Sequence, residues 1–382
     1  MDTYRNPVQV YLGEGCVSQL PGYMEGLSLK NNTVLVLAWG EEVFQNEDIK
    51  AVLKSGKYRW ILHCFTVSNP DLEDLYRLYE NITREPVGLV IGIGGGSILD
   101  MAKSLCCLQG EKISTKDQLR EKILRKDFSA PDCPWIGIPT TAGTGSEVTC
   151  WATVWDREKN SKLSLENQQN YACAAFVDPQ FARSMPLSLT VASALDAASH
   201  ALEAYWAKAS NTVSKALALE AISTIMGHMD GLFEADTRYE AQNAMAKGSL
   251  LAGLAFSNTK TTAGHSLSYP ITLKYNIPHG VAVSLLLAPV MEKNQREIKD
   301  IKAIYKAFGC GSILEIEQKI HWFLQKAQIP VSLQEWGAKE GELSELAENG
   351  STTGRIDNNP VALTQEDIYQ IMSHIYEKGR KK

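Results

Sequence analysis

Four side chains in the second half of the sequence belong to types that bind transition metals, and their spacing suits one common site. Asp196 and His200 are four residues apart in an alanine-rich stretch typical of a helix, so they share one helical face. His265 and His279 follow among small or apolar neighbours, in TAGHSLSYP and NIPHGVAVS. Three imidazoles and one carboxylate suit Fe(II), Zn(II) or a similar ion. The pattern therefore predicts a divalent-metal site, although a single pair of this kind is often only a hydrogen bond.

A lysine among threonines lies shortly before the third of these residues. Lys260 has Thr259 on one side and Thr261 and Thr262 on the other, five residues before His265. A lysine is a compact point charge and hydroxyl groups donate hydrogen bonds, a combination that suits a phosphate or phosphonate. Lys260 therefore either binds an anionic tail of the substrate or points to solvent from an outer helical turn.

Two loops rich in small residues each follow a short apolar run that predicts a strand. The first, GGGS at 94–97, lies between VGLVIGI and a predicted helix, and the second, PTTAGTGSE at 139–147, follows WIGI. Backbone N–H groups in such loops approach phosphates closely, and a helix N-terminus adds positive charge. Ligands of open α/β sheets gather beyond the carboxyl ends of the strands. The two loops together predict a pyrophosphate site, although the G-x-G-x-x-G spacing is absent.

The candidate cofactor loops and the candidate metal ligands fall in two halves of the sequence with different predicted secondary structure. The first half alternates apolar runs with helical patterns, which predicts an α/β domain with a mostly parallel sheet. The predicted strands are 33–38, 60–67, 87–93 and 135–138, with helices at 71–82 and 97–108. After Pro186 the predicted helices are 189–208, 213–233, 241–254, 281–293, 298–308 and 313–326, and a last helix capped by Thr364. We expect an α/β dinucleotide-binding domain over 1–185 and an all-α metal-binding and substrate domain over 186–382.

Composition narrows the classes of function and partner. The formal net charge is −6, and the one cationic cluster is Lys378 with 380–382, so no electrostatic footprint for nucleic acid is present. The eight cysteines form no C-x-x-C pair, which predicts reduced thiols. The sequence has neither a secretory signal pattern nor an apolar run of about 18 residues. We expect a cytoplasmic protein with no membrane or nucleic-acid partner.

These motifs resemble those of the iron-containing (group III) alcohol dehydrogenase family. The matching segments, in family order, are NPVQVYLGEG at 6–15, GGGSILDMAK at 94–103, IPTTAGTGSEVT at 138–149, FVDP at 176–179, DAASHALEAY at 196–205, LAGLAFSN at 251–258 and IPHG at 277–280. The resemblance spans nearly the whole chain. It implies a dehydroquinate synthase-like fold with its active site between a nucleotide domain and a helical metal domain. NAD(P)H and a divalent metal, Fe(II) or alternatively Zn(II), are the implied cofactors, and we expect a homodimer.

The resemblance also implies roles for individual residues. The four metal ligands would be Asp196, His200, His265 and His279. Positions that match dinucleotide contacts are Gly95, Gly96, Ser97, Thr140, Thr141, Thr144, Thr149 and Lys162. The motifs add Gly94, Asp100 and Ser146, and the end of the first buried strand adds Trp39 and Gly40.

Two positions depart from the family pattern. Many members carry a further histidine four residues after the third ligand, where this chain has Tyr269. Tyr269 either takes part in proton transfer, as a poorer base than histidine, or only shapes the pocket. NAD-restricted relatives often place an aspartate where this chain has Trp39 and Gly40, with Glu41 next. Both NAD(H) and NADP(H) therefore stay open.

These observations lead us to expect a metal-dependent NAD(P)-linked alcohol dehydrogenase or aldehyde reductase, with Tyr269 and Lys260 as its candidate catalytic and substrate-binding residues. NPV near the start, WD at 155–156, NTKTT at 258–262 and HSLSYP look like the phosphonoacetaldehyde reductase branch. That branch implies reduction of phosphonoacetaldehyde to 2-hydroxyethylphosphonate. The alternatives are a reductase of small uncharged aldehydes and, outside the oxidoreductases, a sugar-phosphate cyclase-like lyase or an inactive binding protein of the same fold.

Overall fold

A computed structural model describes residues 2–82, 85–131, 133–159, 161–350 and 354–377, so the cationic cluster at the C-terminus lies outside the described residues. The chain divides into two compact units. The α/β unit comprises Asn6–Thr141 and Ser146–Arg183, and the helical unit comprises Met1–Arg5, Ala142–Gly145 and Ser184–Lys382. The main division thus lies two residues before the predicted one, and two short segments of the first half belong to the helical unit.

The α/β unit is built on a six-stranded sheet in which all neighbouring strands are parallel, as the sequence predicts. The spatial order is β1-β8-β5-β4-β2-β3. The strands are β1 Gln9–Leu12, β2 Thr33–Ala38, β3 Arg59–Cys64, β4 Leu89–Gly94, β5 Trp135–Pro139 and β8 Ala174–Val177. From β2 the chain moves outward to β3 and then crosses back to β4, so the strand order reverses between β2 and β4.

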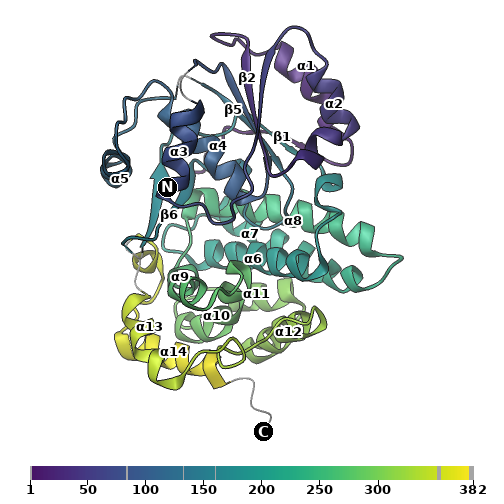
Figure 1. Cartoon of the computed structure of the whole chain (residues 1–382). Coiled ribbons are helices and arrows are strands. Elements are labelled where there is room, and N and C mark those ends of the chain that lie inside the picture. The colour runs from purple at the N-terminus through teal and green to yellow at the C-terminus, as the bar shows by residue number, and fades with distance from the viewer. Residues whose placement is uncertain (1, 83–84, 132, 160, 351–353, 378–382) are drawn as a thin grey trace. The chain divides into compact units, whose positions relative to one another are not determined.

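Helices cover both faces of this sheet because its central strands are apolar on both sides. Leu35 and Leu37 of β2 pack into one hydrophobic core, and Val34 and Val36 pack into the other. The helices are α1 Leu20–Glu25, α2 Glu47–Leu53, α3 Leu72–Ile82, α4 Gly96–Leu108 and α5 Lys116–Arg125, with short 3₁₀ turns η1 Cys16–Gln19, η2 Glu41–Gln45, η3 Ser146–Val148 and η4 Pro179–Ala182. In Figure 1, α1 and α2 lie on one face, and α3 and α4 on the other.

The four predicted strands are present, with shifts of up to three residues at their ends, whereas β8 was not predicted. Two further strands that were not predicted, β6 Trp151–Asp156 and β7 Ser161–Glu166, form an antiparallel pair. Trp155 of this pair also forms an isolated parallel β-bridge with Asp71. β6 is buried on both faces, so it lacks the alternation that marks a hairpin strand exposed on one side.

The second unit is largely helical, as predicted. Its helices are α6 Leu187–Trp206, α7 Thr212–His228, α8 Arg238–Thr259, α9 Ala263–Tyr275, α10 His279–Asn294, α11 Ile301–Phe308, α12 Ile313–Lys326, α13 Leu343–Asn349 and α14 Gln365–Glu377, with 3₁₀ turns η5 Met229–Phe233, η6 Glu340–Glu342 and η7 Ile356–Asn358. Thr364 caps α14 through its hydroxyl, which accepts from the Asp367 N–H. Within the described residues, no helix has the length and apolar character needed to cross a membrane.

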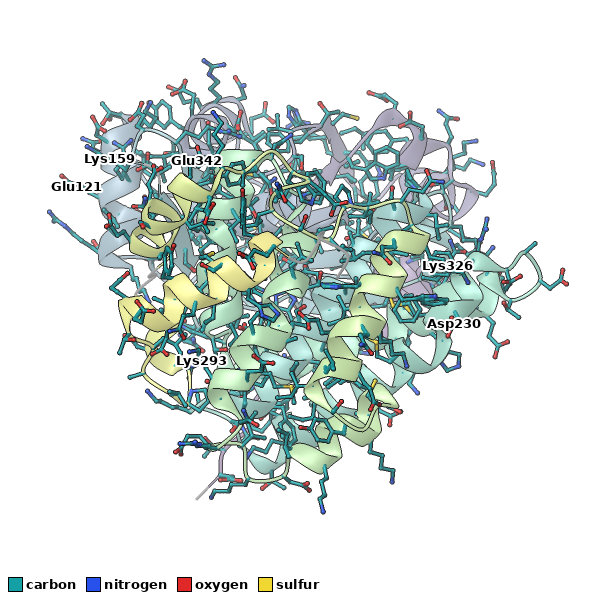
Figure 2. The ribbon with its side chains drawn as sticks, turned by 90° about the horizontal axis from the view of Figure 1, so that it is seen from below. Glu121, Lys159, Asp230, Lys293, Lys326 and Glu342 are labelled. Carbon is teal, nitrogen blue, oxygen red and sulfur yellow. The ribbon has the colours of Figure 1, made fainter. Side chains whose placement is uncertain are left out.

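Lys293 and Lys326 lie on the helices of this unit as seen in Figure 2, and each contacts another element of the unit. Lys293 of α10 contacts the Asp367 carboxylate of α14 at 2.8 Å. Lys326 of α12 lies over the ring of Phe233 in η5, with its Nζ 4.8 Å from the ring centroid. The first of these contacts joins α14 to α10, the helix that begins with the candidate ligand His279.

Helices α9 and α13 were not predicted in this unit, and α9 is the one that carries a predicted metal ligand. Gly264 and Pro270 weaken its helical pattern, since both residues lower helix propensity. Its buried hydroxyls make tertiary contacts instead, as in the 2.7 Å hydrogen bond from the Ser266 hydroxyl to the Gly350 carbonyl. Packing thus stabilises a helix that local propensity disfavours.

Candidate functional site

Helix α6 presents three ionisable side chains on one buried face. Asp196, His200 and Glu203 are spaced i, i+4 and i+7, which places them along a single stripe of an α-helix. Small residues allow neighbouring helices to come close to this stripe. A Cβ at Gly280 of α10, for example, would collide with the Ala192 carbonyl of α6. The stripe therefore faces the first turns of neighbouring helices rather than solvent.

The first turns of α9 and α10 supply the other two predicted ligands. His265 is the third residue of α9 and His279 is the first residue of α10. Ligand atoms of Asp196, His265 and His279 all lie within 4.8 Å of one another, and this is the one such group of three among the described residues. Residues distant in the sequence thus converge on a volume the size of a single ion.

His200 lies beside this group. Its Nδ1 is 3.8 Å from the Asp196 Oδ1. Its ring stacks on Phe256 at 4.3 Å and lies 4.2 Å from the His265 ring, centroid to centroid. The structure therefore brings all four predicted ligands together, with three of them forming the tighter cluster.

The geometry of Asp196 and His265 fits a bound cation. The Asp196 Oδ1 and the His265 Nε2 are both buried and have no hydrogen-bond partner. They are 3.7 Å apart, too far for a hydrogen bond. Buried polar atoms nearly always have partners, so two acceptor-capable atoms facing each other require a cation between them or a proton on one. Carboxylate oxygen and imidazole nitrogen are ligands that Fe(II) and Zn(II) accept.

Charge interactions in the cluster shift both pKa values strongly. Burial alone would raise the pKa of Asp196, but the three surrounding histidines hold it below its usual range. Burial alone would lower the pKa of His265, but the negative charges of Glu203 and Asp196 raise it to about 9. The cluster is therefore built to hold positive charge, whether a proton or a metal ion supplies it.

Tyr269 and Lys260 occupy different places around this cluster. The Tyr269 ring is buried and lies nearly parallel to the His279 ring, 5.8 Å away between centroids. Lys260 follows the last residue of α8, with φ 61° and ψ −176°. A non-glycine residue rarely adopts this conformation, which costs on the order of 1–3 kcal/mol. The structure thus places Tyr269 against a candidate ligand and Lys260 in a strained turn.

Contacts on both sides of Lys260 hold that turn in place. The Lys260 N–H donates to the Phe256 carbonyl at 2.7 Å. The Asn358 side-chain amide donates to the carbonyls of Thr259 and Thr261, at 2.8 and 3.0 Å. The segment η7, far along the chain, therefore fixes the backbone on either side of the lysine.

The glycine-rich loop lies at the reversal point of the sheet in the α/β unit. Gly94 ends β4 and Gly96 begins α4, so Gly95, Gly96 and Ser97 are partly exposed at the carboxyl end of β4. The Thr140 N–H donates to the Gly94 carbonyl at 3.0 Å, which joins this loop to the one after β5. Such a reversal point is where dinucleotides bind in open α/β sheets.

The glycines of this loop serve two purposes. A Cβ at Gly94 would collide with Ile98, so Gly94 permits the tight turn from strand to helix. A Cβ at Gly95 would lie 3.1 Å from the Thr141 Cγ2 and so would narrow the space between the two loops. Thr141 therefore lies directly across from Gly95, as the two-loop interpretation requires.

Several predicted cofactor residues have partners inside the α/β unit. The Asp100 carboxylate accepts from the Ser146 hydroxyl at 2.6 Å and from the Thr153 N–H at 2.8 Å. The fully buried Lys103 donates to the Thr149 hydroxyl at 2.9 Å and to the Trp151 carbonyl at 2.7 Å. These contacts fasten the end of the second loop to α4.

The remaining predicted cofactor residues are dispersed. Trp39 is exposed just after β2, and its N–H donates to the Ile93 carbonyl of β4. Gly40 follows in an extended conformation. Lys162 of β7 lies over the Trp155 ring at 5.6 Å. Thr144 belongs to the short segment Ala142–Gly145 of the helical unit, where Gly145 packs against Gly253 of α8.

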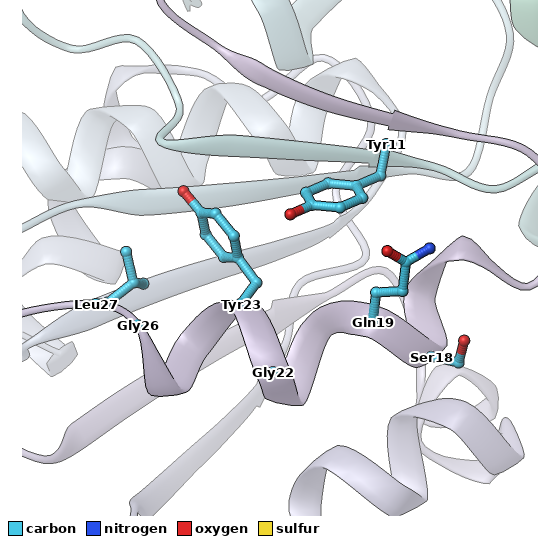
Figure 3. Close-up of a pocket in the computed structure, with 7 residues that line it drawn as sticks. All are labelled: Tyr11, Ser18, Gln19, Gly22, Tyr23, Gly26 and Leu27. Carbon is cyan, nitrogen blue, oxygen red and sulfur yellow. The ribbon is translucent and has the colours of Figure 1, made fainter.

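A pocket of about 590 Å³ lies elsewhere, between β1 and α1 of the α/β unit (Figure 3). Its lining includes Tyr11 and Tyr23, whose rings meet edge to face, together with Gln19 and Ser18. None of the predicted site residues lines it. It is a hollow at the edge of the sheet, not the place where the candidate catalytic groups meet.

Two functional candidates escaped the sequence analysis. Glu203 accepts a 2.6 Å hydrogen bond from the His265 Nδ1, and Lys103 organises the loop after β5. A signal for Glu203 was available, because it continues the i, i+4 spacing of Asp196 and His200 by one further turn. The signal for Lys103 was its place as the last residue of the matching segment GGGSILDMAK, since a lysine in a predicted helix is otherwise usually exposed.

A doubly wound parallel sheet with a glycine-rich loop, together with a helical unit that holds a histidine–aspartate cluster, is the arrangement expected of a nucleotide-linked metalloenzyme. Comparison with known proteins specifies the family. The description "Iron-containing alcohol dehydrogenase" matches residues 7–179, and "Fe-containing alcohol dehydrogenase family, C-terminal" matches residues 190–376. The chain therefore belongs to the iron-containing alcohol dehydrogenase family. Its members are oxidoreductases that use NAD(P) and a divalent metal, typically iron.

Similar proteins match over nearly their whole length. Long-chain-alcohol dehydrogenase 1 of Geobacillus thermodenitrificans is 31% identical over 382 residues, which cover 96% of this chain and 94% of the relative. The NADPH-dependent butanol dehydrogenase of Clostridium saccharobutylicum is 27% identical over 394 residues, with 97% of each chain covered. The structure of sulfoacetaldehyde reductase from Bifidobacterium kashiwanohense in complex with NAD⁺ superposes with a TM-score of 0.87 over 98% of both chains. At 23% identity, that structure supports the fold alone.

Proposed function

We propose that this chain reduces an aldehyde with an anionic tail, most specifically phosphonoacetaldehyde to 2-hydroxyethylphosphonate, with NAD(P)H as hydride donor. The observation that supports the reaction class is the convergence of Asp196, His265 and His279 within 4.8 Å, in a chain of the iron-containing alcohol dehydrogenase family. The observation that supports an anionic substrate is the strained, doubly anchored Lys260. Fe(II) is the proposed metal and Zn(II) the alternative.

Asp196, His200, His265 and His279 would hold the metal. When bound, the ion supplies Lewis-acid polarisation of the substrate carbonyl. The Asp196 carboxylate contributes the negative charge of the ligand set, and its low pKa keeps it ionised at neutral pH. His265 is kept in place by its hydrogen bond to Glu203. The protein thereby keeps the Asp196 carboxylate ionised and the His265 ring fixed in position for metal binding.

The dinucleotide would bind at the carboxyl ends of β2, β4 and β5. Gly95, Gly96 and Ser97 offer backbone N–H groups at the start of α4, where pyrophosphate oxygens are favoured. Thr140 and Thr141 border the same space. Trp39 and Gly40 follow β2, where the adenosine ribose of NAD(H) or NADP(H) would lie. Asp100, Ser146 and Thr149 support this site through the contacts that join α4 to the second loop.

Lys260 is the proposed recognition group for the substrate tail. Strained residues persist only where surrounding contacts hold them, and they concentrate at functional sites. Two of the three threonines beside Lys260 have partners within the protein, since the Thr262 hydroxyl accepts from the Trp206 indole at 2.8 Å and the Thr259 hydroxyl donates to the Lys260 carbonyl at 2.9 Å. The charge of the lysine would therefore carry most of the recognition.

A panel of aldehydes tests this proposal. The protein, loaded with Fe(II) or Zn(II), is assayed by absorbance at 340 nm with NADH and NADPH. Phosphonoacetaldehyde is compared with sulfoacetaldehyde, which has one negative charge, and with uncharged butyraldehyde. The proposal expects kcat/KM to be highest for phosphonoacetaldehyde. A preference for butyraldehyde would make the chain a reductase of small uncharged aldehydes, and no activity on any aldehyde would exclude the oxidoreductase assignment.

The homodimer and the cytoplasmic location stay predictions. They complete the proposal of a metal-dependent aldehyde reductase without contributing to its argument. Light scattering after gel filtration measures the first directly, since a dimer has about twice the mass of the 42.2 kDa chain.

A further inference from the structure

We propose that Glu203 is a positioning residue of the metal site, which orients His265 and fixes the first turn of α9. This inference rests on the proposed metal-dependent function, because it assigns Glu203 a role toward the ion that the cluster would bind. Glu203 is fully buried on α6, one helical turn beyond His200. A buried carboxylate is costly unless it is paired, so its contacts reveal what it does.

The Glu203 carboxylate accepts four hydrogen bonds from one short segment. Its Oε2 accepts from the Thr262 N–H at 2.8 Å and from the His265 Nδ1 at 2.6 Å. Its Oε1 accepts from the Gly264 N–H at 2.6 Å and from the His265 N–H at 3.3 Å. The carboxylate thus holds both the backbone and the side chain of His265, as well as the N–H groups of the N-cap residue Thr262 and of Gly264 in the first turn of α9.

The contact to the His265 ring decides which nitrogen is available to a metal. A carboxylate can only accept, so the Nδ1 facing it must carry a proton. In the neutral imidazole, the lone pair then lies on Nε2, which is the atom that faces Asp196 without a hydrogen-bond partner. Carboxylates that hold metal-binding histidines in this way fix the ring and make the ligand more basic.

The neighbourhood is shaped for this contact. A Cβ at Gly264 would lie 2.8 Å from the Glu203 Oε1, so only glycine leaves the carboxylate in place. The Trp206 indole, three residues beyond Glu203, holds the Thr262 side chain at 2.8 Å. Glu203 and Trp206 of α6 therefore both hold the start of α9.

The helical unit also contains a carboxylate–histidine pair that serves as a control. Glu317 of α12 accepts from, or shares a proton with, the His374 Nε2 of α14 at the same 2.6 Å distance. Glu317 is buried, but neither residue belongs to the metal cluster. Breaking this pair removes a comparable contact from the same unit without touching a metal ligand.

The test uses the full chain and Co(II), whose absorption spectrum reports on its coordination. The change is Glu203→Gln. In either orientation the amide NH₂ faces N–H donors, either Thr262 and His265 Nδ1 or Gly264 and the His265 backbone. We expect Co(II) affinity, measured by competition with a chromogenic chelator, to fall about ten- to a hundredfold. The ligand-field bands of bound Co(II) should also change in position or intensity.

Two further variants keep the inference falsifiable. Gly264→Ala retains the carboxylate but displaces it, so it should weaken Co(II) binding in the same direction even if Glu203→Gln folds poorly. Glu317→Gln should bind Co(II) as the wild type does. Wild-type affinity and spectrum in both Glu203→Gln and Gly264→Ala, or an equal loss in Glu317→Gln, would overturn the positioning role. A wild-type protein that binds no Co(II) would instead overturn the metal-dependent function.

Discussion

Individual ligands in the cluster determine whether an ion is retained. His265 and His279 come from different helices, and each removal leaves an incomplete set around Asp196. We predict that the wild type carries one Fe(II) or Zn(II) per chain after loading, and that His265→Ala and His279→Ala lose it. Metal analysis by mass spectrometry after desalting measures the content. His374→Ala, which lies outside the cluster, should keep its metal, and full occupancy in both ligand variants would exclude this site.

The raised pKa of His265 makes metal binding depend on pH. Without metal, the charges of Glu203 and Asp196 raise that pKa to about 9, so the ring is protonated at pH 7. A metal must displace this proton, and affinity therefore rises as pH increases toward 9. We predict a slope of about tenfold per pH unit between pH 7 and 8.5, with about one proton released per Zn(II). Calorimetry in buffers of different ionisation enthalpy counts that proton, and a flat dependence would contradict the charge argument.

Lys260 tests the substrate class. Losing a charge-assisted hydrogen bond costs about 1.5–3 kcal/mol, or roughly ten- to a hundredfold in kcat/KM. We predict this loss in Lys260→Ala with phosphonoacetaldehyde and little loss with butyraldehyde. Lys274→Ala is a matched control, since Lys274 of α9 is paired with Glu342 and Glu345 on the protein surface. Equal losses on both substrates would make Lys260 structural, and no loss on either would mean that it faces solvent.

At the level of elements, the turn from β4 to α4 carries the cofactor prediction. Gly95 has φ −72° and ψ −174°, so it is not required for a left-handed conformation, and its role must lie in access. A valine there would crowd Thr141 and cover the N–H groups of α4. We predict that Gly95→Val weakens NAD(P)H binding at least tenfold, by about 1.4 kcal/mol or more, while Co(II) affinity stays unchanged. Fluorescence titration with NADH measures the affinity for the dinucleotide.

The control for this variant is the unchanged metal site in the other unit. If Gly95→Val binds NADH as the wild type does and keeps its melting temperature, the loop is only a tight turn. If both NADH and Co(II) binding fall, the variant has disturbed the whole fold, and Gly95→Ala becomes the informative substitution.

At the scale of the whole molecule, the division into two units predicts where a metal has its effect. The ligands come from α6, α9 and α10, all in the helical unit. An ion that binds the native state but not the unfolded state stabilises the elements that supply its ligands. We predict that chelation increases amide hydrogen exchange in these helices, by tenfold or more in α9, while β2, β4 and β5 change little. Uniform change across both units would contradict a local role for the metal.

The sequence by itself determined the features that depend on local repetition. Buried parallel strands are continuous apolar runs, so β2, β4 and β5 were predictable from 33–38, 87–93 and 135–138. The four-residue spacing of Asp196 and His200 placed both on one face of a helix, because this spacing is close to one helical turn. The first loop followed from its position between a strand and a helix, and the second from its position after another strand. The fold class and the candidate ligand set therefore required little tertiary information.

Tertiary structure alone decided how these pieces are supported. Helix α9 contains Gly264 and Pro270, so its helical state depends on packing and on the Glu203 carboxylate rather than on propensity. Lys103 can be buried because its ammonium group donates to the Thr149 hydroxyl and to the carbonyl of Trp151, the first residue of a strand that was not predicted. Asn358 fixes the turn at Lys260 from about a hundred residues away. Each of these contacts joins residues with no periodic relation in the sequence, so only the folded chain reveals them.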